Sequence, residues 1–116
     1  MRIEKEDSYF DDDMLLCHED AHFTGEVVAR DANGQVIGLL NYVEGVEWGP
    51  HCQWYPDGSK KKEGTTQRGV AVGDWRKWHP NGQLAEHSVY NSQGWPVRRQ
   101  QWDEDGDVTE DRSYTA

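Results

Sequence analysis

Two groups of side chains in this chain have residue types that could bind a metal ion. In the first, His18 and His22 are four residues apart, which is the spacing of metal ligands on one face of a helix. Glu19 and Asp20 lie between them, in a segment rich in acids. That setting favours a solvated surface cluster, so we do not predict a metal site from this pair.

The second group, Asp103, Asp105 and Asp107, has the alternating acids of a calcium-binding loop. The glycine of such a loop is its sixth residue, but here Gly106 is the fourth. The twelfth position also lacks the glutamate that completes the site. We interpret this run as a turn with solvated acids, and we predict no metal ligand in the chain.

Motifs that mark common catalytic sites are missing from the sequence. It has no Gly-rich phosphate loop, no His-Glu-x-x-His and no Gly-x-Ser-x-Gly. Cys17 and Cys52 form neither a Cys-x-x-Cys pair nor a dense disulfide framework. We therefore predict no catalytic residue, no cofactor and a function other than catalysis.

The charge of the chain is concentrated at its two ends. The net charge is −10: residues 1–20 carry −6, residues 103–116 carry −5, and the residues between them carry +1. Such ends repel nucleic acid and anionic lipid but attract a basic protein. They could equally serve to keep the chain soluble. No apolar run reaches the ~18 residues of a membrane span, and no hydrophobic stretch of a signal peptide follows the first residues, so we expect a cytoplasmic protein.

A repeat of 24 residues organises most of the sequence. Its clearest marks are four Asx-Gly pairs, at Asn33-Gly34, Asp57-Gly58, Asn81-Gly82 and Asp105-Gly106. Such pairs tolerate the backbone of a tight turn, and each stands between two stretches of strand length. Tryptophan recurs with the same step at positions 54, 78 and 102, with Arg30 in the first copy. Each copy is therefore predicted to be a β-hairpin.

The repeat predicts an all-β fold, a single elongated antiparallel β-meander of four tandem hairpins. The copies cover residues 25–48, 49–72, 73–96 and 97–116, within a repeat domain of residues 23–116. Successive tryptophans of the repeat should shelter one another. Residues 1–22 form an acidic N-terminal capping segment, whose apolar side chains should close the open end of the sheet. The candidates, counting Phe23 beside the segment, are Tyr9, Phe10, Met14, Leu15, Leu16 and Phe23.

Strand alternation separates the tryptophans into groups. If Trp78 packs inward, Trp75 lies on the opposite face, which could be open to solvent. Trp48 and Trp95 lie at links between copies. Exposed tryptophans are favoured anchors of protein interfaces. The alternative is that a sheet with only 19 Leu, Ile, Val and Phe residues uses both faces for packing.

The repeat resembles the variant class of MORN repeats, in which an aromatic residue precedes an Asx-Gly turn. The matching stretches are Trp54-Tyr55-Pro56-Asp57-Gly58 and Trp78-His79-Pro80-Asn81-Gly82-Gln83-Leu84. Phe23-Thr24-Gly25-Glu26-Val27-Val28 is similar to the start of the array in bacterial proteins of this class. Those proteins are commonly described as antitoxins or immunity proteins. The resemblance covers about residues 23–114 and implies binding of a toxin.

We therefore predict a monomeric antitoxin or immunity protein that binds a cognate toxin, with a basic nuclease among the candidates, and occludes its active site. We expect neither nucleic acid nor membrane as a partner. The residues expected to contact the partner are Asp11, Asp12, Asp13, Glu19, Asp20, Tyr55, Trp75, His79, Trp95, Asp103, Glu104 and Asp105.

A structural scaffold or a membrane-surface protein is the alternative function. A lipid-binding role needs a basic face, which Lys60-Lys61-Lys62 with Arg68 could supply.

Overall fold

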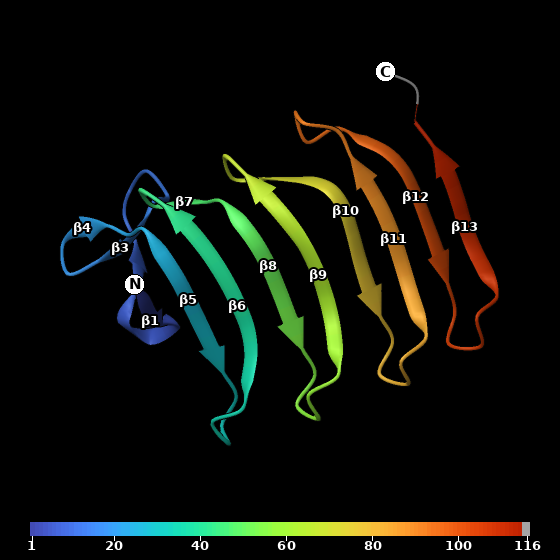
Figure 1. Cartoon of the computed structure of the whole chain (residues 1–116), viewed down its shortest axis with the longest axis horizontal. Coiled ribbons are helices and arrows are strands. Elements are labelled where there is room, and N and C mark those ends of the chain that lie inside the picture. Colours follow the sequence, from blue (N-terminus) through green and yellow to red (C-terminus); the bar gives the residue numbers. More distant parts are fainter. Residues whose placement is uncertain (115–116) are drawn as a thin grey trace.

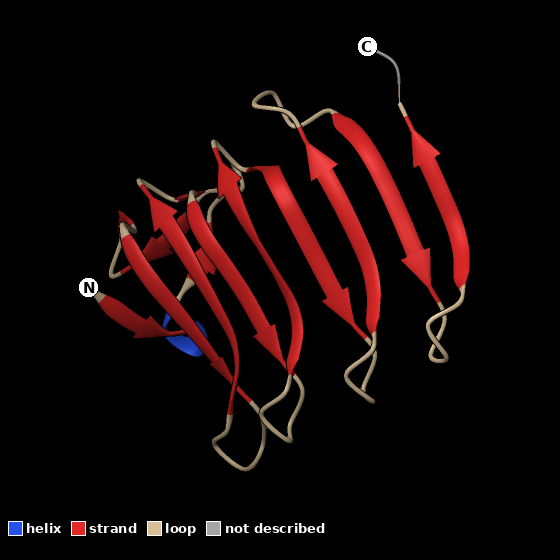
Figure 2. Cartoon of the chain, turned by 45° about the vertical axis from the view of Figure 1, so that its right-hand side comes forward, coloured by secondary structure: helices blue, strands red, loops and turns tan. Residues whose placement is uncertain are grey.

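The computed structural model describes residues 1–114, and most of this part of the chain is β-strand (Figure 1). The single helical element in it is one 3-10 turn, η1 (Lys5–Asp7), drawn blue in Figure 2. The predicted all-β class is confirmed. The strands of the N-terminal half are β1 (Arg2–Glu4), β2 (Tyr9–Phe10), β3 (Leu16–His18), β4 (Ala21–His22), β5 (Gly25–Arg30), β6 (Val36–Val43), β7 (Val46–Glu47) and β8 (Gly49–Trp54). The others are β9 (Lys60–Gln67), β10 (Val70–Trp78), β11 (Leu84–Tyr90), β12 (Pro96–Trp102) and β13 (Val108–Ser113).

Four hairpins follow one another across the large sheet, at the positions that the repeat predicts. They are β5–β6, β8–β9, β10–β11 and β12–β13, and each strand is antiparallel to the next. Each hairpin closes with its Asx-Gly turn. In the first, Gly34 has a φ of 82° and donates its N–H to the carbonyl of Asp31 at 3.0 Å. Glycine adopts a positive φ at little cost. Beside each of the four turns, the pairing of the two strands shifts by one residue, which is a β-bulge.

The N-terminal segment covers the first repeat in two ways. Strand β1 pairs with β5 in parallel and so adds one strand to the edge of the large sheet. Strands β2, β3 and β4 form a separate small sheet. Ile3, Leu16, Phe23 and Val27 make a buried cluster between the segment and the repeat.

Only some of the apolar side chains that were expected to close the open end of the sheet are buried against it. Leu16 and Phe23 are buried, whereas Tyr9, Phe10 and Met14 are 47%, 54% and 73% exposed. The expectation is therefore wrong for these three residues. The physical reason is that β1 already pairs with the edge strand, while Leu16 and Phe23 fill the space beside it.

The tryptophans of the repeat do not stack on one another, contrary to expectation. Trp54, Trp78 and Trp102 are each half-buried, and no ring–ring contact within residues 1–114 joins two of them. Equivalent positions of successive hairpins are two strands apart, about 9–10 Å, so a side chain from the strand between them fills the gap. For Trp78 this side chain is Lys60, whose Nζ lies 6.0 Å from the ring centre.

Polar side chains at the hairpin turns connect neighbouring repeats. The Tyr55 hydroxyl donates a hydrogen bond of 2.6 Å to the carbonyl of Trp78. One repeat later, the Nε2 of His79 makes a hydrogen bond of 2.8 Å with the carbonyl of Trp102. Both side chains, expected to contact a partner, are half-buried and already engaged in holding adjacent hairpins together.

We expect the Tyr55→Phe variant to lose about 1 kcal/mol of unfolding free energy, because a half-buried carbonyl loses its hydrogen-bond donor. Urea denaturation followed by tryptophan fluorescence measures this change. Tyr90→Phe is the matched control, since no side-chain hydrogen bond of Tyr90 occurs among the described residues. Equal stability of the two variants would show that the Tyr55 hydroxyl does not connect the repeats.

Candidate protein-binding surface

The strands of the large sheet end in two rows of turns on opposite sides, which we call its two long edges (Figure 1). One edge carries the four Asx-Gly hairpin turns, which are polar and mostly exposed. The opposite edge carries the links between repeats, which follow β6, β9 and β11. Apolar side chains, all of them exposed except the half-buried Val46, gather at this second edge and at the small N-terminal sheet beside it. We call this set the apolar edge; it consists of Phe10, Met14, Val43, Val46, Trp48, Val70, Trp95 and Val97.

The members of the apolar edge lie close together from one repeat to the next. Phe10, Met14 and Val46 line one hollow of about 270 Å³ beside Gly69. A Cβ built on Gly69 would be 3.6 Å from the side chain of Val46, and one built on Gly94 would be 3.0 Å from that of Val70. The surface is therefore a connected strip and not a set of scattered side chains, which is typical of interaction sites.

Turn length explains how the apolar edge is built. The first two links are two-residue turns, Glu44-Gly45 and Arg68-Gly69, with all four residues at positive φ. The third link has one more residue before its glycine. There the side chain of Asn91 accepts hydrogen bonds from the N–H groups of Gln93 and Trp95, each at 3.0 Å. This wider loop leaves Trp95 69% exposed, as predicted for a tryptophan at a link.

A larger groove lies where the small sheet meets the first two repeats. It has a volume of about 550 Å³ and a mainly apolar lining. Tyr9 and Phe10 form one wall, and Leu40, Tyr42 and Trp54 line the other. The groove opens next to the apolar edge because Phe10 belongs to both.

The same face of the large sheet, which we call the capped face, carries a row of polar side chains further along. Beginning opposite Gly38 of β6, strand register places these residues directly opposite one another, in the order Gln53, Lys62, Lys77, Glu86, Gln101 and Glu110. Glu86 belongs to this row and is only 8% exposed. Its carboxylate accepts hydrogen bonds from Gln101, Arg99 and Ser88 at 2.8, 3.0 and 3.2 Å. Hydrogen bonding therefore compensates the burial of this charge.

Trp75 is buried on the capped face, so its expected exposure to a partner is wrong. It is 8% exposed, and its ring lies directly over Gly64, where no side chain competes for the space. Its Nε1 donates a hydrogen bond of 3.1 Å to the carbonyl of Thr65, and the His51 ring is 5.1 Å away. Strand alternation predicts that Trp75 and Trp78 lie on opposite faces of the sheet. The face that carries Trp75 is not open to solvent at this position, because the ring is buried there.

The predicted acidic contacts lie in three separate turns. Asp11–Asp13 follow β2 and Glu19–Asp20 join β3 to β4, so both belong to the small sheet. Asp103–Asp105 lie in the last hairpin turn, and the structure does not bring them near the others. Asp11 and Asp103 each accept backbone N–H groups of their own turn. The hydrogen bonds from the Leu15 backbone and from His22 hold the pKa of Asp11 below its usual value.

The basic residues considered for lipid binding are largely engaged within the protein. The Nζ of Lys60 is 2.7 Å from the carboxylate of Glu63. Lys62 lies 5.2 Å from the Trp75 ring, and burial together with the charge of Lys77 lowers its pKa. The described part of the chain contains no helix long and apolar enough to cross a membrane.

Tandem β-hairpins and a strip of apolar links define the chain as a repeat protein. Residues 71–92, which span most of β10 and all of β11, match the family model described as MORN repeat variant. The third hairpin is therefore a repeat of this type, and the 24-residue step relates the other three hairpins to it.

Other comparisons add little to this result. No curated protein sequence matches the chain. A crystal structure of a S. aureus TarM mutant in complex with Fondaparinux, alpha-GlcNAc-glycerol and UDP is similar, with a TM-score of 0.44 and 7% identity. The similarity covers 91% of this chain and 19% of that chain. At this level it supports no conclusion about fold or activity.

Proposed function

We propose that this chain is an antitoxin or immunity protein, which binds a cognate bacterial toxin by direct contact and occludes its active site. The observation that carries the proposal is the apolar edge, where Trp95, Phe10 and Met14 are more than half exposed on a folded protein. Large exposed aromatic side chains beside a groove are favoured anchors of protein interfaces. The resemblance of the repeat to those of bacterial antitoxins supplies the class of partner.

Charge and rigidity support the same proposal. Asp12 and Asp13 are exposed between Phe10 and Met14 of the apolar edge and give it an acidic border. Such a border accelerates association with a basic partner and selects against acidic ones. The links are short and hydrogen-bonded within the sheet, so little conformational entropy is lost when a partner docks.

Co-expression with the product of the adjacent gene tests the proposal. We expect that product to stop growth when expressed alone, growth to recover when this chain is present, and the two proteins to copurify. A product that is harmless alone, or one that remains toxic beside this chain, would contradict the proposed function.

Replacement of Trp95 by serine is expected to weaken binding of the partner about tenfold, because a single exposed anchor is lost. Isothermal titration calorimetry measures the affinity, and urea denaturation should show unchanged stability. Val108→Ser is the matched control, since Val108 is 62% exposed but lies in β13, away from the apolar edge. Equal loss of affinity in both variants would argue against a role for this edge.

A further inference from the structure

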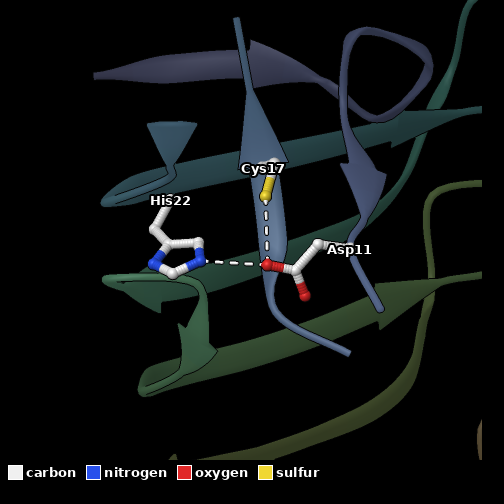
Figure 3. Close-up of side chains that lie close together, drawn as sticks. All are labelled: Asp11, Cys17 and His22. Atoms are coloured by element: carbon white, nitrogen blue, oxygen red, sulfur yellow. Dashed lines mark hydrogen bonds and ion pairs between the residues drawn. The ribbon is translucent and has the colours of Figure 1, made fainter. Parts of the chain in front are cut away.

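Three potential metal ligands of different types meet in the small N-terminal sheet (Figure 3). Asp11 follows β2, Cys17 lies in β3 and His22 ends β4. The Oδ2 atom of Asp11 is 3.0 Å from the Nε2 of His22 and 3.8 Å from the Sγ of Cys17. All three donor atoms lie within 4.8 Å of one another.

The two separations from the Asp11 oxygen are close to those in the coordination shell of a tetrahedral zinc ion. With bonds of about 2.0–2.3 Å to oxygen, nitrogen and sulfur, neighbouring ligand atoms of such an ion are about 3.3–3.7 Å apart. The two distances from the Asp11 oxygen would change by only a few tenths of an ångström on binding. Thiolate, imidazole and carboxylate together are also a donor set that zinc accepts and that calcium and magnesium do not favour.

Hydrogen bonds orient the carboxylate toward the other two ligands. The Oδ1 atom of Asp11 accepts the N–H groups of Asp13 and Leu15, each at 2.9 Å, which directs Oδ2 at the thiol and the imidazole. Such outer contacts are a regular part of metal sites. Cys17 is buried, but the side chains of His22 and Asp11 are 42% and 29% exposed. An ion therefore has a route from solvent to these side chains.

We propose that Asp11, Cys17 and His22 bind a zinc ion, with water as the fourth ligand. On binding, the Cys17 thiol releases its proton to solvent. The Nε2–H of His22, which now faces the Asp11 carboxylate, is replaced by the tautomer with its hydrogen on Nδ1, so that Nε2 coordinates the metal. Bonds from zinc to sulfur, nitrogen and oxygen replace the two hydrogen bonds that now link the side chains. The ion would connect the three strands of the small sheet, and so fix the position of Phe10 and Met14 at its border.

Cobalt titration of the full chain, after treatment with a chelator, tests the proposal. Cobalt bound by a thiolate gives a charge-transfer absorption band in the near ultraviolet, and zinc should displace it. We expect this band in the wild-type protein and in Cys52→Ser, whose substituted residue lies in β8 outside the cluster. The band should be absent in Cys17→Ser, with a loss of zinc affinity of at least about 100-fold.

Asp11→Asn provides a second variant that does not depend on the folding of Cys17→Ser. Its amide oxygen can still accept the N–H groups of Asp13 and Leu15, while the ligand charge is removed. We expect zinc affinity to fall in this variant while circular dichroism shows an unchanged fold. Absence of the thiolate band in the wild-type protein, its persistence in Cys17→Ser, or its loss in Cys52→Ser would each overturn the proposal.

Discussion

Replacement of Trp75 by alanine is expected to lower the free energy of unfolding by about 3–4 kcal/mol, because it leaves a cavity over Gly64. The change also removes the hydrogen bond to Thr65 and the contact with His51. Urea denaturation measures the loss. Trp95→Ala is the matched control, since the same substitution at a 69% exposed indole should leave the stability nearly unchanged. Similar losses at the two positions would show that Trp75 is not part of the core.

The contact between the Trp75 ring and Gly64 can also be tested by changing the glycine. Gly64→Ala should destabilise the protein by about 1–3 kcal/mol, since the added methyl group would overlap the Trp75 ring. Alanine normally stabilises a strand relative to glycine, so the sign of this effect is informative. In Gly38→Ala, the new methyl group would lie 3.3 Å from the Cβ of Ala29, and we expect a smaller effect.

Glu86→Gln is expected to cost roughly 2–3 kcal/mol of unfolding free energy. The substitution leaves Arg99 with only its 3.5 Å pair to Glu110, and it changes the hydrogen bonds of the buried Glu86 side chain with Gln101 and Ser88. Asp111→Asn is the matched control because it removes the charge of an exposed pair with Arg98, and it should leave the urea midpoint unchanged. An equally small effect of the two substitutions would contradict a central role for Glu86.

The pH dependence of stability follows from the same carboxylate. Burial raises the pKa of Glu86, but the hydrogen bond from Gln101 and the charges of Lys77 and Arg99 outweigh it and lower the pKa overall. The unfolded chain then binds this proton more readily than the folded protein. The contribution of Glu86 is complete above its ordinary pKa and is lost as the pH falls through the lowered value. Acid titration of the urea midpoint should therefore be shallower in Glu86→Gln than in the wild type.

The hairpins were predictable because the Asx-Gly pairs and the glycines must occupy fixed positions in each turn. The sequence also contained a signal for the apolar edge, of which the predicted contact residues included only Trp95. The residue after each link glycine is apolar, at Val46, Val70 and Trp95. Since the link turns share one edge of a meander, three such residues had to lie near one another.

The sequence did not show which face of the large sheet is open to solvent, and it did not show that Asp11, Cys17 and His22 lie together. Strand alternation places Trp75 and Trp78 on opposite faces of the sheet. It does not show which of the two faces is covered by another segment, nor where a glycine leaves room for a large side chain to be buried. The register shift between Val72 and Arg76 in β10 has no simple sequence signature. The three proposed ligands lie in or directly after three different strands without regular spacing, and His22 is brought to Asp11 by the pairing of the small sheet.

Hydrogen exchange of this chain, alone and bound to the adjacent gene product, tests most directly whether the apolar edge is the binding surface. We predict that the partner protects the link turns, at residues 43–48, 68–70 and 91–97. Protection confined to the hairpin turns, at residues 31–35, 55–59, 79–83 and 103–107, would contradict this account.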